Sequence, residues 1–170
     1  MSTEQPSAAL PTGRSVGHSA VDLDGTDRAI IAELVRDGRA AIRSLAEKVH
    51  ISRANAYSRI ARLQDSGAIR GFTARLDPIK AGLGTTAYVA LTLDQYAWRT
   101  VSEGLRAIPC IESFALLGAD YDVLALVRAA DNEELRRVVL EQIQDLPGVR
   151  STRTWLVFEE VEGHGTDWTG

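Results

Sequence analysis

The sequence predicts an α+β fold with two domains, and two patterns in it carry this prediction. Between Ser44 and Gly67, apolar residues recur at helical spacing on either side of a short turn, which is typical of a helix-turn-helix. From Thr85 to Val161, alternating segments and helical segments follow one another in the order βαββαβ. We therefore expect an N-terminal helix-turn-helix domain followed by a ferredoxin-like sandwich of two helices on a four-stranded antiparallel sheet.

Composition and turn signals divide the chain into five expected segments. The content of 45% hydrophobic and 25% charged residues is ordinary for a globular protein, and 170 residues suit one domain or two small ones. The first residues mix Pro, Gly, Ser, Ala and Thr without periodicity. The segments are a disordered arm (1–21), a helix-turn-helix domain (22–76), a hinge (77–84), a ferredoxin-like domain (85–162) and a tail (163–170).

The first helix has clear start and stop signals, whereas the second has weak ones. Asp24 is the expected N-cap of the first helix, with Leu23 as the preceding apolar residue, and Gly38 ends it. The second helix starts near Ala41 without a capping Ser or Thr. In the turn that follows, His50 takes the place where glycine at positive φ is common, so we assign it a turn role rather than a metal or catalytic one.

The third helix has one apolar face and one small, polar face. Ser52 is its expected cap, and the apolar residues at helical spacing are Ala56, Ile60 and Leu63. A small, polar face lets a helix approach base edges in the major groove, although an amphipathic helix with a merely solvated face is the alternative. The candidate DNA-binding residues are Arg53, Ala54, Asn55, Tyr57, Ser58, Arg59 and Arg62.

Charge distribution favours DNA contact over a solvated face. Residues 39–75 contain eight Arg or Lys and two acidic residues, a net charge of +6, although the whole chain carries −4. Within the helix, at least one of Asn55, Ser58 and Arg62 is expected to read base edges, and Arg53 in the first turn to hold a phosphate. Arg59 lies nearer the core, where it either braces the domain or reaches a flanking phosphate.

A short strand is expected over residues 68–76, because polar and apolar residues alternate there. No second strand follows before Asp77 and Pro78, so this strand has to pair elsewhere, and pairing across a dimer is the simplest solution.

The second domain has an expected strand from Thr85 to Leu93 and a helix through Trp98 to Ile108. Two strands at 111–117 and 122–129 follow, then a helix from the capping pair Asp131 and Glu134 to Pro147-Gly148, and an extended segment over 149–161.

Both faces of these strands are apolar, yet two helices cover only one face. A second copy packed sheet against sheet would cover the other face, so we expect a homodimer that assembles further into higher oligomers. A charge placed at Val89 or Val157 is accordingly expected to unfold or dissociate the dimer.

Several classes of protein are excluded by what the sequence lacks. Its single cysteine, Cys110, allows no internal disulfide and no thiolate zinc site, and no cofactor site is indicated. It shows neither a signal peptide nor a run of about 18 apolar residues. We expect a cytoplasmic protein with no membrane partner.

The chain resembles the Lrp/AsnC family of transcriptional regulators over roughly residues 22–161. The residues that carry the resemblance are Leu23, Asp24, Asp27, Leu45, Ala46, Ser52, Arg59, Ile60, Leu63, Gly67, Ile69, Gly71, Asp77, Pro78 and Gly82. The resemblance implies a double-stranded DNA operator as partner and a small amino acid or related metabolite as effector, bound between dimers near a Gly-x-Tyr-Asp turn.

That turn reads Gly118-Ala119-Asp120-Tyr121-Asp122 in this chain, with the glycine one place earlier than in the family pattern. A carboxylate of the turn would pair with the ammonium of the effector, and the N–H groups of Gly118 and Ala119 would bind its carboxylate. An ordinary hairpin turn is the alternative. Two residues of the last strand, Thr152 and Thr154, are further candidates for this site, with cross-strand packing as their alternative role.

Two other functions remain as alternatives to a regulator. One is an enzyme that resembles the tetrapyrrole (sirohaem-type) decarboxylases, which share this architecture and are expected to use histidines of the second domain for proton transfer. The histidines of this chain are His18, His50 and His164, and none lies in residues 85–162. The other alternative is a DNA-packaging protein that ignores metabolites.

Overall fold

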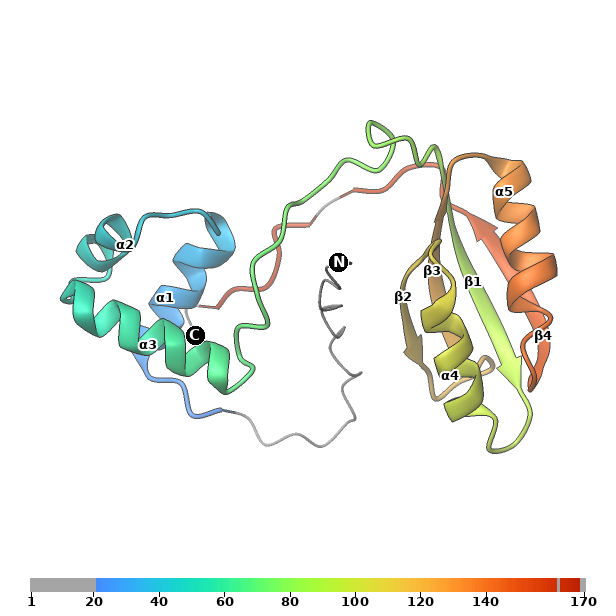
Figure 1. Cartoon of the computed structure of the whole chain (residues 1–170), viewed down its shortest axis with the longest axis horizontal. Helices are drawn as coiled ribbons and strands as arrows, with labels where there is room; N and C mark the ends of the chain where they lie inside the picture. Colours follow the sequence, from blue (N-terminus) through green and yellow to red (C-terminus); the bar gives the residue numbers. More distant parts are fainter. Residues whose placement is uncertain (1–20, 162, 169–170) are drawn as a thin grey trace, which may run out of the picture. The chain divides into compact units, whose positions relative to one another are not determined.

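The computed structural model describes residues 21–161 and 163–168 (Figure 1). The expected arm therefore lies almost wholly outside the described residues. Contacts divide the chain into two compact units, one reaching Thr73 and including the residues from Gly165 onward, the other running from Ala74 to His164. The finer limits of the expected hinge and tail stay predictions. Within the described ranges, no helix is long and apolar enough to cross a membrane.

The first unit is built from three helices, α1 (Gly25–Arg36), α2 (Ile42–Lys48) and α3 (Arg53–Asp65). The expected apolar residues of these helices form its core. The fully or almost fully buried members are Ile30, Leu45, Ala46, Ala56, Ile60 and Leu63. Because each helix is short and has a single apolar stripe, the three helices are stable only when packed on one another.

The ends of these helices follow the local sequence. Asp24 and Asp27 form a capping box on α1, in which the Oδ1 atom of Asp24 accepts from the N–H of Asp27 over 2.8 Å. The Oγ atom of Ser52 caps α3 by accepting from the N–H of Asn55 over 3.2 Å. Ala41, the N-cap of α2, makes no such bond.

The turn between α2 and α3 depends on His50, whose φ is +57° as expected. Its N–H donates to the carbonyl oxygen of Glu47, and the N–H of Ile51 donates to that of Ala46. These two bonds form a Schellman motif, which normally has glycine at the left-handed position.

The strand predicted over residues 68–76 is not formed within the single chain, and its pairing across a dimer stays a prediction. Phe72 and Leu76 are 52% and 75% exposed, and the segment belongs to no ladder of the described sheet. A strand needs a neighbour to take up its N–H and carbonyl groups, and the described part of the chain supplies none here.

The second unit contains one antiparallel sheet in the order β2-β3-β1-β4. Its elements are β1 (Thr85–Leu93), α4 (Trp98–Ala107), β2 (Ile111–Leu116), β3 (Val123–Ala129), α5 (Asn132–Arg137), the π-helical segment η1 (Val138–Ile143) and β4 (Val149–Leu156). The order βαββαβ predicted from the sequence is thereby confirmed. Figure 1 shows α4 and α5 on the same face of this sheet.

The last strand is shorter than expected. It ends at Leu156, which pairs with Ala87 of β1. β1 is the only neighbour of β4 in the described sheet, and it begins at Thr85. The described residues after Val157 therefore have no further strand to pair with.

The two faces of the sheet have different environments. Ala87, Val89 and Leu91 of β1 are fully buried beneath the helices. Of the two outcomes predicted for a charge at Val89, unfolding and dissociation, this burial favours unfolding, because the charge would enter the core itself. The opposite face carries Tyr88, Leu124, Leu126 and Trp155, which alternate with the buried positions along the paired strands.

Candidate functional site

The first candidate site is the exposed side of α3. Ala56, Ile60 and Leu63 are buried, which fixes the opposite side of the helix toward solvent. Of the seven predicted DNA-binding residues, Arg59 is half-buried, and the exposed ones are Arg53, Ala54, Asn55, Tyr57, Ser58 and Arg62.

A buried carboxylate of α1 ties two arginines of α3 in place. Asp27 is fully buried, and its Oδ1 atom accepts from Nη1 of Arg59 over 2.8 Å. Its other oxygen accepts from Nη2 of Arg62. Arg59 also donates to Oδ2 of Asp24 over 2.6 Å, and its Nε atom donates to Oδ1 of Asn55 over 3.0 Å. These five residues form one network, which we call the Asp27 cluster.

The electrostatics of the cluster keep its carboxylates ionised. Burial raises the pKa of Asp27, but the hydrogen bonds from Arg62 and Arg59 outweigh it, so that the pKa lies below its ordinary value. The hydrogen bond from Arg59 is the main cause that lowers the pKa of Asp24. Those same two carboxylates raise the pKa of Arg59.

The cluster separates the predicted DNA-binding residues into two groups. Asn55, Arg59 and Arg62 are bonded within the domain, and the bracing role left open for Arg59 is the one seen here. Arg53, Tyr57 and Ser58 make no side-chain hydrogen bond or ion pair to another described residue. With Ala54, these three residues form the surface that we call the outer face of α3.

The sequence did not reveal the second role of Asp27. Its spacing from Asp24 identifies a capping box, but the approach of Arg59 and Arg62 spans 32 and 35 residues. The spacing of residues within one helix does not reveal a contact with a residue so far along the chain. The sequence feature that could have predicted these ion pairs is a carboxylate in the first turn of one helix, together with arginines beside the apolar face of the helix that packs on it.

The second candidate site is the turn between β2 and β3. The N–H of Leu117 donates to the carbonyl oxygen of Asp122 over 2.7 Å, and the N–H of Asp122 donates to that of Leu91 over 2.9 Å. In addition, the Oδ2 atom of Asp122 accepts from the N–H of Leu93 over 2.7 Å. The carboxylate of Asp122 is thus used to fix the end of β1, while Gly118, Ala119 and Asp120 are exposed.

Tyr121 of this turn lies on the face of the sheet that the helices leave uncovered. Its ring meets that of Trp155 edge to face, with centroids 5.8 Å apart. The guanidinium carbon of Arg153 lies 5.9 Å from the centre of the same ring. Such contacts hold the aromatic ring in one position.

The two predicted threonines are not brought together with the turn. Thr152 and Thr154 pair with Leu91 and Val89, so their side chains lie on the helix-covered face, opposite to Arg153 and Trp155. The Oγ1 atom of Thr152 accepts from Nε2 of Gln144 over 2.7 Å.

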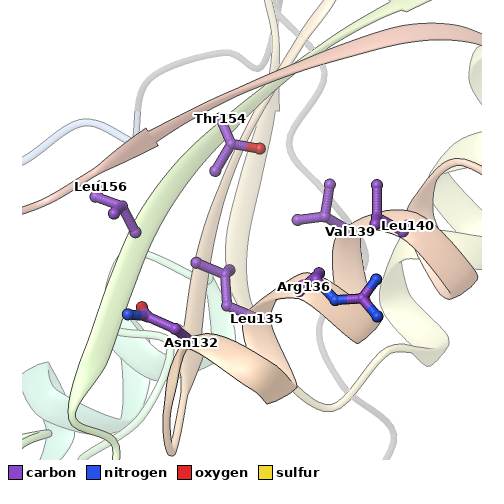
Figure 2. Close-up of a pocket in the computed structure, with 7 residues that line it drawn as sticks. All are labelled: Asn132, Leu135, Arg136, Val139, Leu140, Thr154 and Leu156. Atoms are coloured by element: carbon purple, nitrogen blue, oxygen red, sulfur yellow. The ribbon is translucent and has the colours of Figure 1, made fainter.

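Thr154 instead lines a groove between β4 and the helix formed by α5 and η1, which Figure 2 shows. Its volume is about 410 Å³. The lining residues are Asn132, Leu135, Arg136, Val139, Leu140, Thr154 and Leu156. We call it the α5–β4 groove. No cluster of three or more His, Cys, Asp or Glu side chains suited to a metal ion occurs among the residues described.

Family models match both parts of the chain. Residues 23–64 match the AsnC-type helix-turn-helix domain, and residues 86–166 match the Lrp/AsnC ligand binding domain.

Curated relatives match over most of their length. The HTH-type transcriptional regulator AldR of Mycolicibacterium smegmatis is 35% identical over 147 residues, which are 85% of this chain and 86% of the relative. The proline dehydrogenase transcriptional activator of Rhizobium radiobacter is 33% identical over 151 residues, covering 87% of this chain and 97% of the relative.

Solved structures of similar proteins have the same arrangement of elements. A transcriptional regulator of Neisseria meningitidis, solved as a complex with L-Met, superposes with a TM-score of 0.78 at 26% identity and covers 84% of this chain and 94% of its own. The leucine response regulatory protein of Mycobacterium tuberculosis gives a TM-score of 0.76 at 28% identity, with 85% and 98% covered.

Proposed function

The chain belongs to the Lrp/AsnC family of transcriptional regulators, and from this premise we propose that it binds a DNA operator sequence-specifically under the control of a small amino acid or related metabolite. The observation that carries the proposal is the outer face of α3, which is exposed, while the Asp27 cluster fixes the helix behind it. A helix held this way meets the major groove without first having to be ordered.

The outer face divides into positioning and reading residues. Arg53 follows the cap Ser52, where free N–H groups of the helix already favour an anion, so we assign it a phosphate. Ala54, Tyr57 and Ser58 are assigned the base edges, because they are exposed and make no bond within the domain.

The assignment of Arg62 differs from the sequence prediction. One of its N–H groups is used by Asp27, so we assign Arg62 and Arg59 to backbone contacts with their remaining donors. Asn55, whose carboxamide oxygen accepts from Arg59, orients that arginine.

For the effector, we assign the turn of residues 118–122. Asp120 is exposed and supplies the carboxylate for an ammonium group, because the carboxylate of Asp122 is already engaged with Leu93. The N–H groups of Gly118 and Ala119 are the donors assigned to the carboxylate of the effector. The match to a ligand-binding domain and the L-Met complex of the Neisseria relative support an amino acid as ligand.

We propose a homodimer that covers the face of the sheet left free by the helices. Tyr88 and Trp155 are 39% and 43% exposed there, next to Leu124 and Leu126. Arg128 on the same face is only 11% exposed and is neutralised by ion pairs to Glu112 and Glu160, which raise its pKa. An apolar face whose buried charge is paired within the chain suits a second copy. We also propose that the dimers assemble into higher oligomers and that the protein is cytoplasmic.

An enzymatic function is not proposed. The relatives are named as transcriptional regulators, and residues 85–162 contain no histidine for proton transfer.

The proposal is tested by DNA-binding titrations on a randomised duplex library, with and without each of the twenty amino acids. We expect selection of a palindromic site and a change in its affinity with at least one amino acid. Reciprocity supplies a control, since the operator must then alter the affinity for that amino acid by the same factor. Equal affinity for every duplex, unchanged by amino acids, would favour a DNA-packaging protein instead.

A further inference from the structure

The α5–β4 groove has the size and lining of a site for a small molecule. Its volume of about 410 Å³ lies near the lower end of the range for ligand pockets. Figure 2 shows strand residues Thr154 and Leu156 on one side and helix residues such as Val139 and Leu140 on the other. Leu140 and Leu156 are 41% and 47% exposed, so the apolar part of the lining is open to a ligand.

The polar part of the lining contains a positive charge and hydrogen-bond donors. The guanidinium group of Arg136 makes no ion pair or hydrogen bond with any other described residue. Asn132 uses its carboxamide oxygen to accept from Thr85 over 3.4 Å, which leaves its NH₂ group as a donor. Thr154 adds a hydroxyl group, and none of the seven lining residues is acidic. The groove thus offers donors and a cation for a carboxylate but no counter-charge for an ammonium group.

The helix on one side of the groove is irregular where it contributes Val139 and Leu140 to the lining. The helix begins as α5 and continues as the π-helical segment η1, in which the N–H of Gln144 donates to the carbonyl oxygen of Val139, five residues earlier, over 3.0 Å. Val139 and Leu140, the consecutive residues that line the groove, both belong to η1. π-helical turns are rare and are frequently found at functional sites.

From these observations we propose that the α5–β4 groove is a second small-molecule site, which binds a small monocarboxylate with a short apolar chain and without an α-ammonium group. Arg136 binds the carboxylate, Thr154 bonds a polar substituent of the ligand, and Leu135, Val139, Leu140 and Leu156 contact the chain. This site is separate from the turn of residues 118–122, and its ligand class differs from the amino acid proposed there. It does not depend on operator regulation.

The test uses the whole protein and three probes of one shape. 4-Methylpentanoate carries the carboxylate, 4-methylpentanamide replaces it with a neutral group, and L-leucine adds an α-ammonium group. Calorimetric titration gives the affinities, and amide chemical shifts locate the site. We expect 4-methylpentanoate to bind at least about tenfold more tightly than the other two, with the largest shifts at Val139, Leu140 and Thr154.

Two variants separate the role of Arg136 from a general loss of charge. Arg136→Gln is expected to weaken 4-methylpentanoate at least about tenfold, because a charge-assisted hydrogen bond is lost. Arg137→Gln is the matched control, since Arg137 lies next in α5, pairs with Glu134 and does not line the groove. This control is expected to bind as the wild type does.

Several results would overturn the inference. They are the absence of saturable binding, equal affinity for the carboxylate and the amide, and equal losses in the two variants. Shifts confined to residues 118–122 would also overturn it while leaving the proposed function intact. If the groove amides respond to protein concentration and not to the probe, a second copy of the chain occupies the groove, and the inference fails.

Discussion

The Oδ1 atom of Asp27 in α1 and the Nη1 atom of Arg59 in α3 lie 2.8 Å apart, which joins the first helix of the domain to the third. The second oxygen of this fully buried carboxylate pairs with Arg62. Removing one partner of a buried ion pair leaves the other charge uncompensated. Asp27 is therefore important both for the stability of the three helices and for the position of two cations.

We expect Asp27→Asn to destabilise the helix-turn-helix unit by about 2 kcal/mol, because two charge-assisted bonds are lost while solvent still reaches both arginines. Hydrogen exchange of the amides in α1 and α3 measures this unit separately from the second. Asp65→Asn, an exposed change at the end of α3, is the control. Unchanged protection in Asp27→Asn would show that the capping box alone holds α1.

The same carboxylate should make this unit sensitive to acid. Since the pKa of Asp27 is lower in the folded than in the unfolded chain, its stabilisation is complete at pH values above the ordinary pKa of 3.8 and is lost as the pH falls toward the folded pKa. Unfolding free energies measured between pH 6 and 2 should fall less steeply in Asp27→Asn. Asp24 and Glu33, whose pKa values are also lowered, account for the remaining slope. Parallel curves for the two proteins would contradict the assignment.

Arg53 and Ser58 should give different signatures in DNA binding. Arg53→Ala is expected to weaken all sequences alike and to reduce the salt slope by about one, as for the loss of a phosphate contact. Ser58→Ala, or Tyr57→Ala, should relax preference at one symmetric pair of operator positions and cost about 1–3 kcal/mol there. Arg106→Ala, an exposed cation of α4, is the control. Sequence-dependent losses in Arg53→Ala would reverse the two roles.

The two acidic residues of the turn should separate stability from effector response. Asp122→Ala removes the acceptor for the N–H of Leu93 and is expected to destabilise the second unit by about 1–3 kcal/mol. Asp120→Ala should leave stability unchanged and abolish the amino-acid response, with DNA affinity in the absence of effector preserved. Thermal unfolding and DNA titrations measure the two effects. A normal response in Asp120→Ala would mean that the turn has only a structural role.

Leu126→Glu should separate the two copies of the chain. Leu126 pairs with Tyr88 on the uncovered face, so a charge there meets the partner without entering the core. Sedimentation velocity should give a folded monomer for this variant and a dimer or larger species for the wild type. Thr100→Glu, which adds the same charge to the exposed side of α4, is expected to stay associated. A monomeric wild type at micromolar concentration would rule out this interface.

The sequence predicts elements well where the pattern is local. Ser52 and Asp24 cap the helices as expected, and His50 adopts the expected positive φ, because each of these features depends on a few adjacent residues. The end of β4 could not be foreseen, since it depends on where the neighbouring strand β1 begins. The sequence did predict that residues 68–76 have no partner strand next to them in the chain.

Parts of the candidate sites depend on contacts between distant segments of the chain, and these contacts could not be predicted from the sequence. Helical geometry placed Arg62 toward solvent, yet its long side chain reaches back to Asp27. The Gly118 to Asp122 turn suggested two equivalent carboxylates, whereas the main chain of Leu93 binds only Asp122. Strand alternation separates Thr154 from Tyr121, and the α5–β4 groove arises only when α5 packs beside β4.

The left-handed conformation of His50 affects how precisely α3 is oriented relative to α2. A non-glycine residue in this region holds conformational strain of about 1 kcal/mol or more. Glycine would relieve the strain, but it would also give the unfolded chain more freedom, so the two effects oppose each other in the unfolding equilibrium. The torsion itself would then be less restricted, and the angle between α2 and α3 would vary more. The precision with which α3 is oriented relative to α2 is thus separable from thermodynamic stability at this residue. A melting curve would not reveal a loss of that precision.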